Sequence, residues 1–347
     1  MNGLQALDQW QNFMSHPTGA RLGFINAIFW LGLGISFPIA AWAANKYGRK
    51  LGIYFGYILL FLGVALLAGR RQTTFMLSRL FVGSASAWFG STAPLLIAET
   101  AFPPHRGVAS AMYMCGWHVG GIVAGFTTLG TRNVRGGWAW EIPAVLQLLL
   151  PILALPGFIL SSESPRWLVS AGRPDEARRV VSGLHTNGES DSSLVDLEMM
   201  EITKTLLAEE ETHRKPGYAE MLKTPGNRHR LFISITLGIF SQWSGNGVIS
   251  YYLPMVLETI GFADTRDQLL VSACLFTWNL VFAVAAALLV DKWGRRPLFL
   301  ASAAIMLVSY IIVTGLSASF DQTGRASTGT AVIPFLFMFF AGYDIAL

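Results

Sequence analysis

The chain has 347 residues, of which 52% are hydrophobic and 13% charged, whereas soluble domains carry about 25% charged residues. This composition excludes an ordinary water-soluble protein. The net charge of +4 does not indicate a nucleic-acid partner, because the basic residues are concentrated in the stretches between apolar runs.

Apolar runs follow one another along the whole chain, and most reach the ~20 residues that a helix needs to cross a bilayer core. Glycines lie inside the runs, as is common where transmembrane helices pack closely. Buried core helices of a large soluble protein are the alternative, but the number of full-length runs argues against them. The sequence therefore predicts an all-α, polytopic membrane protein. The runs cover roughly residues 22–43, 51–69, 75–98, 108–129, 138–160, 231–256, 268–290, 297–318 and 331–347.

A polar segment separates the runs into two groups. We expect an N-terminal helix bundle over residues 1–160, a cytoplasmic linker over 161–230 and a C-terminal bundle over 231–347. Within the linker, Pro174 precedes two acidic residues, and a proline followed by acids is a helix-start signal. Residues 191–211 carry a weak apolar stripe among acids. The linker is thus expected to form short amphipathic helices.

The basic residues are distributed unevenly between the two sides of the runs. Of the 25 Lys and Arg, 17 fall on the side that holds the linker and 6 on the other side. The positive-inside rule places the richer side in the cytoplasm. We expect an integral protein of the plasma membrane with this orientation.

The chain starts with "MNGLQALDQW", which lacks the basic and apolar segments of a secretory signal. This start resembles a junction between helices, and the last run, "FLFMFFAGYDIAL", stops while it is still apolar. Both ends suggest a fragment or a truncated gene product. Cys115 and Cys274 lie in apolar runs, which favours inert packing thiols over a disulfide framework.

Two similar phrases follow apolar runs that are six helices apart. "NKYGRK" covers residues 45–50 and "DKWGRR" covers residues 291–296. The glycine in each phrase allows a tight turn, and the flanking cations can bind neighbouring helix ends. Positive-inside anchoring would explain one copy. Two copies in register indicate a parallel repeat of six-helix halves, the design of major facilitator transporters.

Further motifs resemble the sugar porter family of the major facilitator superfamily, and the resemblance covers nearly the whole chain. It implies the two-bundle fold of that superfamily in an incomplete form, without helix 1 and helices 11 and 12. The start of the chain and "WSGNGVISYY" look most like the fungal lactose and hexose permease branch. The matching stretches are "SRLFVGSASAWFGSTAPLLIAETAFPPHRG" (78–107), "WAWEIPAVLQ" (138–147), "SESPRWLVSAGRPDEA" (162–177) and "SQWSGNGVISYY" (241–252).

The chain departs from the family pattern at several positions. Asn45 replaces the usual aspartate of the first loop motif, and Glu141 stands where an arginine is common. In the seventh helix the family's asparagine position falls on Gly247, with Asn246 one residue earlier. One residue corresponds to a rotation of about 100° on a helix, so Asn246 is expected to approach a substrate from a different angle.

Sugar binding requires neutral hydrogen-bonding groups together with aromatic faces. Gln242 and Asn279 match sugar ligands of the family. Asn279 stands twelve residues before Asp291, which places it about 18 Å along the helix and near the middle of the membrane. Packing is the alternative role for each aromatic residue, and His118 is expected to bond a neighbouring helix. The secondary candidates are Asn246, Trp243, Tyr251, Tyr252, Trp117 and His118.

Charged residues at the cytoplasmic helix ends have opposite signs, so they can form a network that latches one state of a transporter. Arg79 is the only cation inside an apolar run, and an unpaired charge there is costly. In proton-coupled members of the family the matching arginine faces an aspartate of helix one, which implies a coupling role for Arg79. The expected network comprises Arg49, Lys50, Glu99, Arg106, Glu163, Arg166, Asp291, Arg295 and Arg296.

The sequence contains no phosphate-binding loop, no Cys/His cluster with metal spacing and no triad pattern, so we expect no enzyme and no cofactor. The resemblance implies alternating-access transport of a neutral sugar, a hexose or a disaccharide such as lactose, driven by protons. The expected partners are the sugar, protons and the lipid bilayer, with no nucleic acid. A transporter-like sugar sensor and a transport-dead fragment remain as alternatives, and the identity of the sugar and the oligomeric state stay open.

Overall fold

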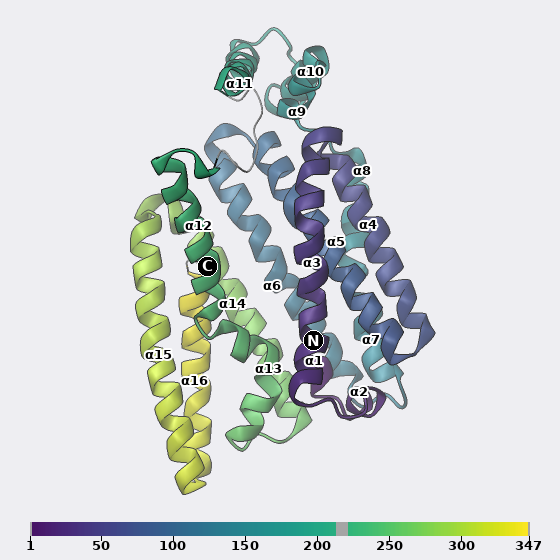
Figure 1. The fold of residues 1–347 in the computed structure, drawn as a ribbon, viewed down its shortest axis with the longest axis vertical. Coiled ribbons are helices and arrows are strands. Elements are labelled where there is room, and N and C mark those ends of the chain that lie inside the picture. Colours follow the sequence, from purple (N-terminus) through teal and green to yellow (C-terminus); the bar gives the residue numbers. More distant parts are fainter. Residues whose placement is uncertain (1, 213–220, 346–347) are drawn as a thin grey trace.

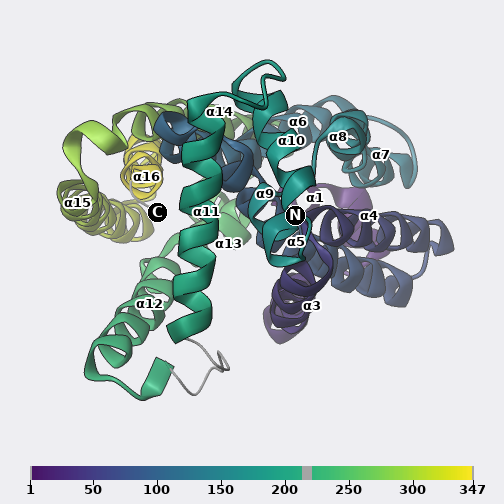
Figure 2. The ribbon, with the colours of Figure 1, turned by 90° about the horizontal axis from the view of Figure 1, so that it is seen from above.

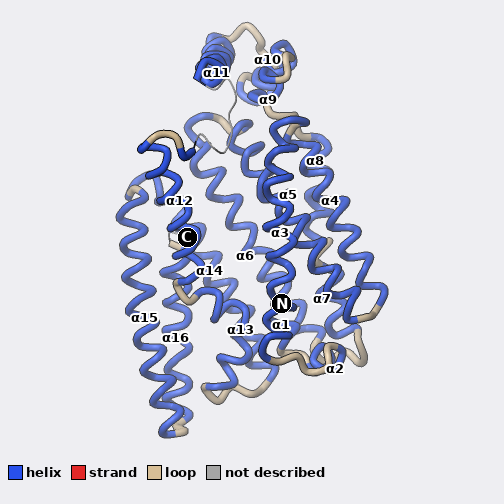
Figure 3. The backbone as a smooth tube through the Cα atoms, viewed as in Figure 1, coloured by secondary structure: helices blue, strands red, loops and turns tan. Residues whose placement is uncertain are grey.

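The computed structural model describes residues 2–212 and 221–345, which form helices joined by turns and loops (Figures 1 and 3). No strand occurs in these two ranges. Seven helical stretches are long and apolar enough to cross a membrane, in agreement with the predicted fold class. They are Gly19–Tyr47 (α3), Arg49–Gly69 (α4, Arg49–Ala65, with the 3-10 turn η1, Leu66–Gly69), Gln72–Thr100 (α5), Trp138–Leu160 (α7, Trp138–Leu146, and α8, Leu149–Leu160), Thr265–Leu289 (within α14, Thr265–Trp293), Arg295–Thr323 (α15) and Ala326–Asp344 (α16).

Two of the nine predicted runs are not among these stretches. The run 108–129 forms α6 (Arg106–Thr131), preceded by the 3-10 turn η2 (Pro103–His105). Glycines and threonines recur along α6 and lower its hydropathy. The run 231–256 is not one continuous helix, because the chain breaks there into two helices.

The break separates α12 (Pro225–Trp243) from α13 (Asn246–Thr259). Gly245 has φ +94° at this point, a left-handed conformation that glycine adopts readily. The start of α12 is fixed by Thr224, whose hydroxyl accepts a hydrogen bond from the backbone N–H of Asn227. This helix therefore begins six residues before the predicted bundle boundary at residue 231.

The helices gather in two groups with a boundary between them. In Figure 1, α3, α4, α5, α7 and α8 lie on one side and α12, α15 and α16 on the other, while α6 and α14 meet in the middle. The view from above shows the same division (Figure 2). The two groups follow the chain order, so the first five runs and the last four form separate sides of the molecule.

The described residues 161–212 of the linker form three helices beyond the ends of the long helices (Figure 1). Pro174 takes the first position of α10, as its sequence signal predicts. His185 at the end of α10 connects to the membrane helices, because its Nε2 lies 3.2 Å from the carbonyl oxygen of Thr100. The three helices are α9 (Pro165–Ser170), α10 (Pro174–His185) and α11 (Ser193–Thr212).

The opposite end is closed by two short helices, α1 (Asn2–Gln5) and α2 (Asp8–Phe13). Trp10 is fully buried there, and its ring lies 6.3 Å from that of Phe75. The ring of Phe13 stacks on Trp140 with centroids 4.6 Å apart. This aromatic cluster fixes the ends of α5 and α7 and leaves the region between the two groups of helices for the candidate site.

Candidate functional site

The two groups of helices approach each other most closely where α6 crosses α14. A Cβ atom on Gly121 would lie 2.2 Å from the ring of Phe276, and one on Gly125 would lie 3.0 Å from the Cα of Ala273. A second contact joins α3 to α13 through the rings of Trp30 and Tyr251. Polar side chains gather between these contacts. We call them the polar seam, which comprises Arg79, His118, Gln242, Asn246, Tyr251, Asn279, Tyr343 and Asp344.

At one end of the polar seam, Arg79 faces an aromatic cluster. Its guanidinium carbon lies 5.1 Å from the ring centroid of Phe29, a cation–π distance. Its Nε is buried with no hydrogen-bond partner among the described residues. The hydroxyl of Tyr251 lies within electrostatic range of Arg79, and the ring of Tyr251 meets Trp30 edge to face at 6.1 Å.

The middle of the polar seam consists of neutral hydrogen-bonding groups. The side chains of Gln242 and Asn246 both lie close to the hydroxyl of Tyr343. The side-chain oxygen of Asn246 also accepts a hydrogen bond of 2.6 Å from the hydroxyl of Ser250. Gln242 and Asn246, which the sequence analysis selected, thus approach one tyrosine of α16.

The third part of the polar seam surrounds Asn279, which is 4% exposed. With its amide nitrogen facing α16, Asn279 donates to Oδ2 of Asp344 at 3.3 Å and to the carbonyl oxygen of Leu275 at 2.9 Å. Oδ1 of the same carboxylate lies 3.6 Å from Nε2 of His118. His118 therefore contacts a neighbouring helix, as the sequence analysis expects.

The structure places the other aromatic candidates outside the polar seam. The indole of Trp243 is 81% exposed and makes no ring contact or hydrogen bond with the described residues. Trp117 is also exposed. Tyr252 is directed toward α3, with its hydroxyl near Gly23 and its ring against the aromatic cluster of α1 and α2. Of the aromatic candidates, Tyr251 alone contributes to the polar seam.

Four residues of the expected charge network come together near α9. The Nε and Nη2 of Arg49 donate to the two carboxylate oxygens of Glu99, each at 2.9 Å. The carboxylate of Glu163 accepts from the backbone N–H groups of Arg49 and Lys50, at 3.1 and 3.0 Å. This carboxylate therefore caps the N-terminus of α4, where a negative charge is favourable. Gly48 has φ +103°, and a Cβ there would lie 2.7 Å from Glu163.

The second copy of the repeat has different surroundings. Gly294 has φ +79° and open space around it, and Arg295 and Arg296 are exposed with no ion pair in the described part of the chain. The side chain of Asp291 lies outside the described residues. Arg106 donates to the carbonyl oxygen of Ala101 at 3.2 Å instead of joining Glu99.

Arg166 is half-buried on α9, and the Nζ of Lys50 donates to the carbonyl oxygens of Ile159 and Ser161. Two of the departures from the family motifs have local contacts. Glu141 forms a 2.8 Å ion pair with Arg70, whereas Asn45 accepts a hydrogen bond from the indole N–H of Trp167 through its backbone carbonyl. The changed side chain of Glu141 thus has a charged partner, and the contact of Asn45 does not depend on its side chain.

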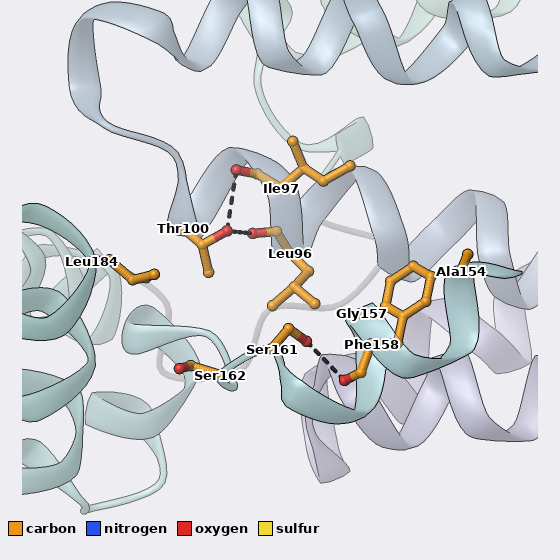
Figure 4. Close-up of a pocket in the computed structure, with 9 residues that line it drawn as sticks. All are labelled: Leu96, Ile97, Thr100, Ala154, Gly157, Phe158, Ser161, Ser162 and Leu184. Carbon is orange, nitrogen blue, oxygen red and sulfur yellow. Dashed lines mark hydrogen bonds between the residues drawn. The ribbon is translucent and has the colours of Figure 1, made fainter.

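A pocket at the linker end lies between α5, α8 and α10 (Figure 4). Two of its hydroxyl groups already have partners, because Thr100 donates to the carbonyl oxygen of Leu96 and Ser161 to that of Phe158, which leaves the hydroxyl of Ser162 (Figure 4). The remaining lining is mainly apolar, so the pocket offers few groups to a sugar. The lining residues are Leu96, Ile97, Thr100, Ala154, Gly157, Phe158, Ser161, Ser162 and Leu184.

Three residues of the polar seam or its edge were not predicted from the sequence: Trp30, Tyr343 and Asp344. Asp344 carried a signal, since it is an acid in the apolar run 331–347, as Arg79 is a cation in an apolar run. Among the described residues, no group of three or more His, Cys, Asp or Glu side chains is arranged to hold a metal ion.

The sequence profile of the family described as "Sugar (and other) transporter" matches residues 2–347. Sugar transport protein 13 of Arabidopsis thaliana is 26% identical over 331 residues, which cover 94% of this chain and 61% of that protein. The high-affinity glucose transporter of Kluyveromyces lactis is 23% identical over 322 residues, with 92% and 58% of the two chains covered. The chain thus spans about three fifths of the length of these relatives.

Solved structures share the fold. The proton:xylose symporter XylE bound to 6-bromo-6-deoxy-D-glucose superposes with a TM-score of 0.80 at 22% identity, covering 99% of this chain and 77% of that one. A partially occluded inward-open form of XylE from E. coli gives a TM-score of 0.77 at 21% identity, covering 99% and 79%. The chain is therefore an integral, multi-pass membrane protein with the major facilitator fold.

Proposed function

The chain belongs to the sugar (and other) transporter family of the major facilitator superfamily, a family of transporters and not of enzymes, and on that premise we propose that the protein carries a neutral sugar across a membrane by alternating access. The observation that carries the proposal is the polar seam between the two groups of helices. The groups act as two halves, residues 1–160 and 231–347, that rock about this seam, with residues 161–230 as the linker between them.

The chemistry of the polar seam suits a sugar. Its central groups, Gln242, Asn246 and Asn279, are amides that offer both donors and acceptors to hydroxyl groups. The rings of Trp30 and Tyr251 stand beside them and can pack against the apolar face of a pyranose. The C-terminal end of α16, which bears Tyr343, lies at mid-height of the helices (Figure 1). Substrate sites of such transporters lie near the bilayer midplane.

The relatives support a monosaccharide as the substrate and a proton gradient as the driving force. One relative is named a glucose transporter, and a structural neighbour is described as a proton:xylose symporter. We propose a hexose as the substrate, with a disaccharide such as lactose as the second possibility. We further propose that the plasma membrane is the site of action and that Arg79 helps to couple proton and sugar movement.

Uptake of labelled D-glucose, with lactose as competitor, tests the proposal in cells that lack their own sugar uptake. Gln242→Ala and Asn279→Ala each remove neutral hydrogen bonds worth about 0.5–1.5 kcal/mol net, so KM should rise roughly twofold to tenfold. Gln147→Ala is the matched control, because Gln147 is exposed and lies away from the polar seam. If both amide variants transport normally over a full concentration series, the sugar site lies elsewhere.

A further inference from the structure

A buried pair of titratable side chains connects the two halves. His118 belongs to α6 and Asp344 to α16, and Nε2 of the histidine lies 3.6 Å from Oδ1 of the aspartate. This distance is within the range of an ion pair but longer than a hydrogen bond. The two side chains are 14% and 5% exposed. A carboxylate in such a place is costly unless a cation or a proton neutralises it.

The surroundings of Asp344 contain little other charge. No Lys or Arg lies within 4.0 Å of its carboxylate among the described side chains. The facing titratable groups are Cys115, one turn before His118 on α6, and Tyr343 on its own helix. From α14 comes the uncharged amide of Asn279. On α15, Tyr310 packs against Phe339 instead.

Arg79 cannot serve as the group that binds and releases the coupled proton. Its guanidinium has no carboxylate within 4.0 Å among the described residues, and arginine stays protonated in proteins. A coupled proton therefore requires a different residue. An imidazole and a carboxyl group can both exchange protons near neutral pH when their surroundings change.

We propose that the pair formed by His118 and Asp344 is the site at which this protein binds the proton that drives sugar movement, an inference that rests on the proposed function. With one proton the pair is neutral, either as imidazolium and carboxylate or as imidazole and carboxylic acid. When that proton leaves to water, the pair carries one net negative charge. Only the neutral form can remain buried between the two halves at low cost.

The position of the pair connects proton binding to alternating access. His118 moves with the first half and Asp344 with the second, so the pair spans the boundary between the two groups of helices. When the halves part, water replaces His118 as the neighbour of the carboxylate, and the proton can leave on the open side. Asn279 bonds Oδ2 of Asp344 and is also a sugar ligand in the proposed function, so the arrival of sugar alters the hydrogen bonds of the carboxylate.

The test uses the purified protein in liposomes, with two measurements on each variant. The first is exchange of labelled D-glucose between equal internal and external concentrations, which needs no proton. The second is glucose accumulation under a gradient of one pH unit, where one coupled proton allows about tenfold accumulation. Asp344→Asn should abolish accumulation while saturable exchange persists at a lower rate, and Asp344→Glu should retain accumulation. Asp321→Asn, an exposed acid of the same half, is the matched control and should accumulate glucose as the parent does.

His118→Asn should retain accumulation but shift its pH dependence upward, because the carboxyl group without its cation holds the proton to higher pH. Accumulation by Asp344→Asn at the parent level would place the proton site elsewhere, and loss of both exchange and accumulation would make Asp344 a sugar ligand or a structural residue. A parent protein that exchanges glucose without accumulating it would overturn the proton site and leave the proposed function intact. A parent without exchange would overturn the proposed function itself.

Discussion

Arg49 in α4 donates two hydrogen bonds of 2.9 Å to the carboxylate of Glu99 in α5, and the two side chains are only 9% and 13% exposed. A bidentate geometry of this kind fixes both side chains and is stronger than a single contact. The ion pair lies within the first half of the molecule, so it joins two neighbouring helices. Its role in the described state is therefore to position α4 on α5 and to present the α4 N-terminus to Glu163.

Removing one member of this ion pair should destabilise the protein markedly. Glu99→Gln leaves the buried guanidinium of Arg49 without a countercharge, at a cost of about 3–5 kcal/mol. The double variant Arg49→Met/Glu99→Leu should recover much of the loss, because it leaves no buried charge. Thermal unfolding in detergent measures both. A double variant that is as unstable as the single one would show that the pair does more than neutralise charge.

The close packing of α3 on α5 depends on glycine, which has no side chain to separate the two backbones. A Cβ atom on Gly83 would lie 2.0 Å from the carbonyl oxygen of Phe29. Gly83→Ala should force the two backbones apart and cost about 1–3 kcal/mol, as overpacking generally does. Gly34→Ala is the matched control, since Gly34 lies on α3 with open space around it. Equal melting temperatures for the two variants would contradict the observed helix contact.

The length of the apolar runs was sufficient to predict most of the helices, because a long apolar run has few stable conformations other than a helix in a bilayer. The break of the run 231–256 into two helices was not predicted, because it depends on the conformation of Gly245 and not on hydropathy. The Arg49–Glu99 pair joins residues 50 positions apart, and their opposite charges at helix ends on one side of the membrane suggested that both belong to one charge network.

Fewer residues of the candidate site could be predicted from the sequence. Gln242 and Asn279 stood out because they match sugar ligands of the family, and Asn246 because it lies next to the family's asparagine position. Trp243 stands next to Gln242 in the chain but has a different direction around the helix, which only the structure shows. Asp344 was overlooked because its partner His118 lies 226 positions away, on the other side of the boundary between the halves.

The orientation in the membrane can be tested by labelling. The linker carries many of the 17 basic residues on its side, so residues 161–230 should face the cytoplasm. Ser190→Cys places a thiol at an exposed position between α10 and α11. An impermeant maleimide should label it only after the cells are opened, and the parent protein controls for Cys274. Labelling of Ser190→Cys in intact cells would show that the linker faces the outside of the cell and would contradict the predicted orientation.

Counterflow tests the central claim of sugar transport most directly. Liposomes that contain the purified protein are loaded with unlabelled D-glucose and diluted into a trace of labelled D-glucose. An alternating-access carrier should give a transient internal excess of label, and Gln242→Ala should reduce it at low sugar concentration. Label uptake no greater than in protein-free liposomes, from protein that is folded and inserted, would contradict the account.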